Sequence, residues 1–158
     1  MIKLLTPLTQ VDSSAAFTLG TRTATKDGNE YIYLPGTTSV AQYDVVTFLT
    51  AATVQGVNSY GSVTRLATTG GVGPVAVAQA AIISNKYGWF QTKGITWANA
   101  GVGCTVSLPC YASGTAGLIG SGVVSGDLLA GMYFLQAGAP GGTVKVLMND
   151  PFCTDTLS

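Results

Sequence analysis

The chain has 158 residues, with seven basic and seven acidic side chains, no histidine and a formal net charge of zero. That length fits one domain, and the balanced charge gives neither nucleic acid nor an anionic membrane an electrostatic reason to bind. Only 9% of the residues are charged, against about 25% in an average soluble domain. Surfaces with so little charge associate easily, which favours a protein that works in contact with other proteins over an isolated domain with a bland surface.

The first 28 residues form a polar segment that ends in the turn signal Asp27-Gly28. Because it has few bulky apolar residues, we expect an extended, partly ordered N-terminal arm over residues 1–28. Its beginning lacks the apolar stretch of a secretory signal. No apolar run approaches the ~18 residues that span a membrane, so we expect no membrane partner.

Short apolar and β-branched runs, separated by glycine-rich turns, follow the arm. We expect strands, in chain order, at 31–34, 44–49, 62–67, 74–83, 86–94, 104–112, 117–124, 131–136 and 143–148. Such strands, without sustained helical periodicity, predict an all-β fold: a single-domain antiparallel β-barrel or sandwich, with a jelly roll and a β-tulip both open. We place this domain at residues 29–150 and a loose C-terminal tail at 151–158.

The segment 74–83 is apolar or small on both faces of a strand, with valines on one face and alanines on the other. This pattern suits a strand that is covered on both sides. An Ala-rich helix is the alternative, because alanine is the best helix former. Pro74 and the valines favour the strand.

The three cysteines are Cys104, Cys110 and Cys153. An odd number argues against a closed disulfide framework. In an extended segment, Cys104 and Cys110 would lie roughly 20 Å apart, too far for a bond. We expect three reduced, buried thiols.

Residues for catalysis are scarce. Without histidine the chain lacks Ser-His-Asp and Cys-His systems and the commonest metal ligand, and its glycine-rich stretches lack the Gly-Lys-Ser/Thr of a phosphate-binding loop. The seven carboxylates are scattered, and nothing selects a glycosidase pair such as Glu30 with Asp127. We therefore expect no enzyme, no cofactor and no metal.

The stretch "KYGWFQTKG" (86–94) concentrates aromatic residues. In a strand, Tyr87 and Trp89 share one face with polar Gln91, while Phe90 points to the core. Large aromatic side chains with polar neighbours are typical of contact surfaces. The alternatives are that Trp89 belongs to the core, or that the aromatic side chains stack on sugars or bases.

Several segments resemble, in their order, the small decoration (cement) proteins on the capsids of tailed bacteriophages. They are "IKLLTPLTQ", "EYIYLPG", "YDVVTF", "VGPVAVAQAAIISNKYGWFQTKG", "AGVGCTVSLPCYASGTAG" and "GMYFLQAGAPGGTVKVLMN". The likeness is strongest over residues 72–97, where "AVAQAAIISNKYGWFQTKG" carries most of it. These motifs are structural, without a catalytic signature.

The resemblance implies a β-rich homo-oligomer, a trimer or dimer, on the outer surface of the capsid in the virion. It would staple neighbouring major capsid protein subunits against the internal DNA pressure. Synthesis in the cytoplasm of the host bacterium suits unpaired cysteines, and an arm that orders on binding adds contact area at an entropic cost. We expect the capsid or subunit contacts to come from Ile2, Lys3, Leu4, Leu5, Pro7, Tyr87 and Trp89.

Two other functions fit the same residues. One is another structural component of the virion, such as a head fibre base or a tail-associated β-domain. The other is a carbohydrate-binding β-module that uses Tyr87, Trp89 and Trp97. The copy number per particle separates the first from a decoration protein, and binding to glycans tests the second.

Overall fold

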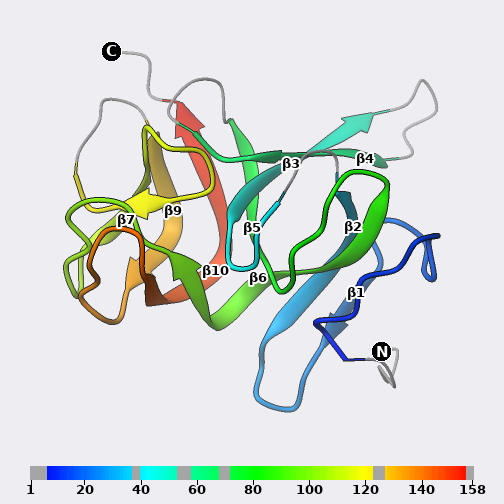
Figure 1. Cartoon of the computed structure of the whole chain (residues 1–158), viewed down its shortest axis with the longest axis horizontal. Coiled ribbons are helices and arrows are strands. Elements are labelled where there is room, and N and C mark those ends of the chain that lie inside the picture. The colour runs from blue at the N-terminus through cyan, green and yellow to red at the C-terminus, as the bar shows by residue number, and fades with distance from the viewer. Residues whose placement is uncertain (1–6, 37–39, 53–57, 68–71, 123–126, 156–158) are drawn as a thin grey trace.

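A computed structural model of the chain describes residues 7–36, 40–52, 58–67, 72–122 and 127–155. These residues are all-β and contain no helix, as the turn-rich sequence predicts (Figure 1). The strands are β1 (Arg22–Ala24), β2 (Glu30–Gly36), β3 (Val45–Ala52), β4 (Asn58–Arg65), β5 (Gly73–Ala78), β6 (Lys86–Asn99), β7 (Pro109–Ala112), β8 (Ile119–Gly120), β9 (Asp127–Phe134) and β10 (Thr143–Asp155). The antiparallel sheet does not close, which is consistent with a β-sandwich.

The molecule has two lobes, and the long strand β6 runs from one into the other, where it pairs with the second long strand, β10 (Figure 1). The first half of β6 pairs with β2, and its second half, from Lys93 to Asn99, pairs with β10. β10 then pairs with β9 along much of its length and meets β5 near its end. One lobe therefore holds β1, β2 and the start of β6, and the other holds the end of β6 with β10, β9, β7 and β8.

β5 and β3 form a middle layer with a hydrophobic core on each side. Val75 and Val77 contribute to the larger core, beneath β10 and β9, whereas Ala76 and Ala78 contribute to the core beneath β2. The prediction of a strand covered on both sides is confirmed, and the helix alternative is wrong. The strand ends at Ala78 rather than residue 83.

A third cluster lies on the outer face of β2 and the first half of β6. It consists of Tyr31, Tyr33 and Trp89, and residues of the N-terminal segment pack over it. The same stretch of β2 thus buries its aromatic residues outward and Ile32 and Leu34 inward. This arrangement explains why "EYIYLPG" is buried along nearly its whole length.

The ends of the domain differ from the predicted boundaries. β1 lies inside the expected arm and pairs with β2, so the sheet begins before residue 29. The expected loose tail is wrong for residues 151–155, which continue β10 in register with β9. Pairing with β9 holds this segment although Pro151 interrupts the strand pattern. Residues 156–158 lie outside the described residues.

Most other predicted strands are confirmed with shifted ends. The segments 104–112 and 117–124 are the exceptions, because only Pro109–Ala112 and Ile119–Gly120 form strands among their described residues. Cys104 makes one isolated bridge with Gly138, and Ser107 has a positive φ of 66° that breaks the extension. All three cysteines are buried thiols, as expected.

Candidate interaction surfaces

The N-terminal segment is fastened across the first half of β6. The backbones of Asp12 and Tyr87 exchange two hydrogen bonds, 2.9 and 3.0 Å long. The Tyr33 hydroxyl donates to Asp12 Oδ2 at 2.6 Å and accepts from the Ala16 amide at 3.2 Å. The described part of the arm is therefore docked on its own domain from Asp12 onwards.

Phe17 covers the aromatic cluster from outside. Its ring centroid lies 5.2 Å from that of Tyr33 in an edge-on arrangement and 5.3 Å from that of Trp89. Tyr33 and Trp89 are themselves 5.1 Å apart. Such edge-on and tilted contacts stabilise aromatic pairs beyond the area that they bury.

The structure describes three of the predicted contact residues. Pro7 is exposed and Tyr87 is half-buried, and the bridge to Tyr87 is made by Asp12, five residues after Pro7. Trp89 is only 2% exposed, so its prediction as a contact residue is wrong. The core alternative for Trp89 is confirmed, since Phe17 and Tyr33 cover its ring. Ile2, Lys3, Leu4 and Leu5 lie outside the described residues.

The buried position of Tyr33 changes its acidity. Burial, with the hydrogen bond to the Asp12 carboxylate as the second cause, raises the pKa of Tyr33 to about 12. Burial also raises the pKa of the neighbouring Tyr31 above its ordinary value. Both groups are held in their neutral form, which suits a packed cluster rather than a proton-transfer site.

A second surface lies on the other lobe, on the outward side of β6, β10 and β9. Side chains alternate between buried and exposed positions over residues 95–98 of β6, 144–149 of β10 and 132–134 of β9. Five large apolar side chains point outward and are 37–53% exposed: Ile95, Trp97, Tyr133, Leu135 and Leu147. We call this surface the β6–β10–β9 face.

Strand register makes the β6–β10–β9 face continuous. Leu147, on the central strand β10, is the direct partner of Ile95 on β6 and of Tyr133 on β9. Trp97 is the partner of Lys145, whose Nζ lies 5.1 Å from the centre of the indole ring. Directly paired side chains on one face of a sheet contact one another, so these residues form one patch.

The patch was missed in the sequence because its strands carry apolar residues at both alternating positions. "TVKVLM" places valines and leucine on opposite faces, and only the packing of Val144, Val146 and Met148 in the larger core shows which face is outside. Of this surface, the sequence pointed to Trp97 alone, as one of three residues for carbohydrate binding together with Tyr87 and Trp89. The trio does not assemble, because Trp89 is buried and Tyr87 lies on the other lobe.

Charged residues in the described ranges mostly support the fold. Asp44 is buried and forms an ion pair with Arg65, with 2.7 Å between Asp44 Oδ2 and Arg65 Nε. It also accepts a hydrogen bond of 2.9 Å from the Asn99 side-chain amide. Glu30 pairs with Lys93 across β2 and β6 at 3.3 Å. Asp127 is buried at the start of β9, in the other lobe. The structure therefore does not present Glu30 and Asp127 as a pair on one surface.

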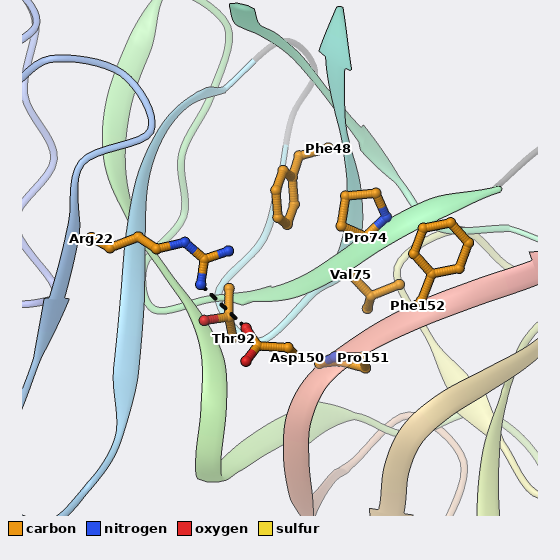
Figure 2. Close-up of a pocket in the computed structure, with 8 residues that line it drawn as sticks. All are labelled: Arg22, Phe48, Pro74, Val75, Thr92, Asp150, Pro151 and Phe152. Atoms are coloured by element: carbon orange, nitrogen blue, oxygen red, sulfur yellow. Dashed lines mark hydrogen bonds and ion pairs between the residues drawn. The ribbon is translucent and has the colours of Figure 1, made fainter. Parts of the chain in front are cut away.

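A small cavity of about 60 Å³ lies where the lobes meet (Figure 2). Arg22 and Asp150 point toward each other there and form an ion pair of 3.2 Å. The buried Thr92 hydroxyl lines the cavity, and none of the described residues forms a hydrogen bond with it. The lining residues are Arg22, Phe48, Pro74, Val75, Thr92, Asp150, Pro151 and Phe152. This space suits water molecules and is too small for an organic cofactor.

Within the described ranges, no three His, Cys, Asp or Glu side chains gather so that they could hold a metal ion. No helix in the same ranges is long and apolar enough to cross a membrane. No family model matches the sequence, and no curated protein matches it either.

Proposed function

We propose that the chain is a structural virion protein that decorates the outer surface of a phage capsid and staples neighbouring major capsid protein subunits. A protein that staples must contact at least two neighbours at once. The observation that carries the proposal is that the two lobes carry separate exposed surfaces: the N-terminal segment on one lobe, and the apolar β6–β10–β9 face on the other. Two such surfaces allow one chain to meet a coat subunit and a further neighbour, coat subunit or second copy, at the same time. The resemblance to decoration proteins supplies the identity of the neighbours.

The N-terminal segment is the proposed contact with the capsid. Residues 1–6 continue from Pro7, which is exposed and lies a short distance along the chain from the Asp12–Tyr87 bridge. Apolar side chains at Ile2, Leu4 and Leu5 would add contact area when this part of the arm lies on a coat subunit. A nearly uncharged domain also permits many copies to crowd one shell without mutual repulsion.

The first experiment measures how many copies of the chain accompany each major capsid protein subunit in purified particles. A ratio between one-third and one is expected for a protein that covers the shell. A handful of copies per particle would favour a head fibre base or a tail-associated domain. Absence from particles would contradict the proposal, and a glycan array would then test the carbohydrate-binding alternative.

The second experiment tests the arm. Removing residues 2–6 leaves Asp12 and its bridge with Tyr87 intact, so the domain should keep its fold. Binding to particles stripped of the protein is expected to weaken at least about tenfold, equal to ~1.4 kcal/mol. A variant with the same five positions replaced by glycine and serine separates the side chains from the length of the arm. Unchanged affinity in both variants would exclude the arm as the capsid contact.

A further inference from the structure

We propose that the β6–β10–β9 face binds the same face of a second copy of this chain, forming a two-fold symmetric dimer. This inference names a surface for the homo-oligomer within the proposed function. It is tested on the purified chain without particles, so that either proposal can fail alone. It depends on three properties of the face: its apolar centre, its low charge and its area.

The centre of the face is apolar. Leu147 lies on the middle strand, with Ile95 and Tyr133 directly beside it on the two flanking strands. The Leu135 amide donates to the Lys145 carbonyl at 2.9 Å, which extends the pairing beyond the end of β9. Two antiparallel sheets pack face to face through such alternating outward residues, about 10 Å apart.

Charge favours a second copy as the occupant. Two charged residues occupy outward positions of this face on the three strands. Lys145 already lies over the Trp97 ring, and Lys93, the β6 partner of Asn149, already pairs with Glu30 at 3.3 Å. The face therefore offers no pattern of charges that would recognise a charged partner. It also brings almost no like charges together when it meets itself.

The position of Lys145 sets the direction of the axis. A two-fold axis that crosses the strands at Leu147 carries each Lys145 to the opposite side of the centre. Lys145 is two residues from Leu147, so the two copies of its backbone would be about 13 Å apart along the strand direction. That exceeds the Debye length of about 10 Å at 0.1 M salt. An axis parallel to the strands would instead place the two lysines opposite each other.

The exposed area suits a dimer. Five large side chains at 37–53% exposure leave roughly 400 Å² of apolar surface, within the size of patches that are often functional. Homodimer interfaces are about 65% apolar, so a polar rim around such a patch brings the area to roughly 600 Å² per partner. The total of about 1,200 Å² is at the lower end of the range for specific, stable interfaces. Thr143, Asn149 and Asn99 lie at the borders of the patch and can form this rim.

The test compares two isoleucines in sedimentation velocity. Ile95 on the face is 53% exposed and Ile83, on the other lobe, is 51% exposed. The unmodified chain should sediment as a dimer of two 16.1 kDa subunits. Ile95→Asp places a charge in the apolar centre and should weaken dimerisation at least about 100-fold. Ile83→Asp introduces the same charge and should leave the dimer intact.

A second variant tests the same face if the first variant does not fold. If circular dichroism shows that Ile95→Asp is unfolded, Leu147→Thr decides in the same assay, because threonine keeps a high strand propensity and shortens the central side chain. Dissociation of the dimer should also shift the Trp97 emission to longer wavelength, measured in a Trp89→Phe background.

Several results would overturn the proposal. A monomer at every concentration from about 1 to 100 µM, a trimer, an intact Ile95→Asp dimer, or an equal loss in Ile83→Asp each contradicts it. If the unmodified chain is a monomer and Ile95→Asp loses binding to capsid particles, the occupant of the face is a coat subunit instead of a second copy.

Discussion

Burial controls the reactivity of the three cysteine thiols. Burial raises the pKa of the Cys104 and Cys110 thiols, and Cys104 Sγ lies 3.5 Å from the Ile119 carbonyl oxygen. The thiolate is the reactive form, so both thiols should resist modification in the folded protein. We expect all three cysteines to react slowly with Ellman's reagent at pH 8 and at once in denaturant. Fast reaction of one equivalent in the native protein would contradict the burial.

Tyr33 links the N-terminal segment to β2 through one hydroxyl. Tyr33→Phe removes a donor to the Asp12 carboxylate and an acceptor for the Ala16 amide. The free energy of unfolding at pH 7 should fall by about 1.5–3 kcal/mol, the range for a hydrogen bond to a charged group. Urea unfolding measures this loss. Tyr111→Phe, which removes a hydroxyl from a partly exposed side chain on β7, is the matched control.

The same residue predicts a loss of stability in alkali. The pKa of Tyr33 is about 12 in the folded chain, against an ordinary value of 10.0. Between these values the unfolded chain has released the proton and the folded chain has kept it, so stability falls as pH rises from 10 toward 12. This slope should be smaller in Tyr33→Phe. An identical pH dependence in both proteins would show that Tyr33 does not titrate in this way.

At the scale of elements, Phe17 holds the N-terminal segment against β2 and β6. Phe17→Ala should cost roughly 1–2 kcal/mol, less than a fully buried phenylalanine, because the side chain is only partly buried. Solvent should then reach Trp89, whose emission would shift to longer wavelength in a Trp97→Phe background. Val11→Ala, on the same segment and exposed, is the control. An unshifted spectrum would mean that other residues cover Trp89.

The bend of β10 depends on a glycine in β9. The register between these strands shifts between Met148 and Phe152, and Gly131 lies opposite the irregularity. Gly131 has φ of 86°, and a Cβ there would lie 2.8 Å from the Asn149 carbonyl oxygen. Gly28 has φ of 81° with open space around it. Gly131→Ala should therefore destabilise the fold by at least about 1 kcal/mol more than Gly28→Ala. Equal losses of stability in the two variants would show that the backbone around Gly131 relaxes to accommodate the methyl group.

Strand-forming segments could be predicted where the local pattern decides. The valines and alanines of β5 predicted a strand between two cores, because both alternating sets are apolar. The course of β10 past Pro151 and the burial of Trp89 could not be predicted. Both depend on partners distant in sequence, β9 in one case and Phe17 in the other. The β6–β10–β9 face could not be predicted for the same reason.

At the scale of the whole molecule, shared strands make the two lobes one cooperative unit. β6 pairs with β2 in one lobe and with β10 in the other, and β5 contributes side chains to both large cores. Neither lobe can lose these strands without removing part of the other's core. Unfolding at a fixed protein concentration should therefore be a single transition.

The two tryptophans provide the measurement, because Trp89 lies in one lobe and Trp97 on the face of the other. Trp97→Phe and Trp89→Phe each leave one reporter. Within each protein, the emission and far-ultraviolet circular dichroism should give the same midpoint in urea, with equal slopes. If the Trp89 signal changes first, the N-terminal side opens independently. The lobes would then be joined by continuous strands without being coupled in stability, and the middle layer would have to remain folded on one core alone.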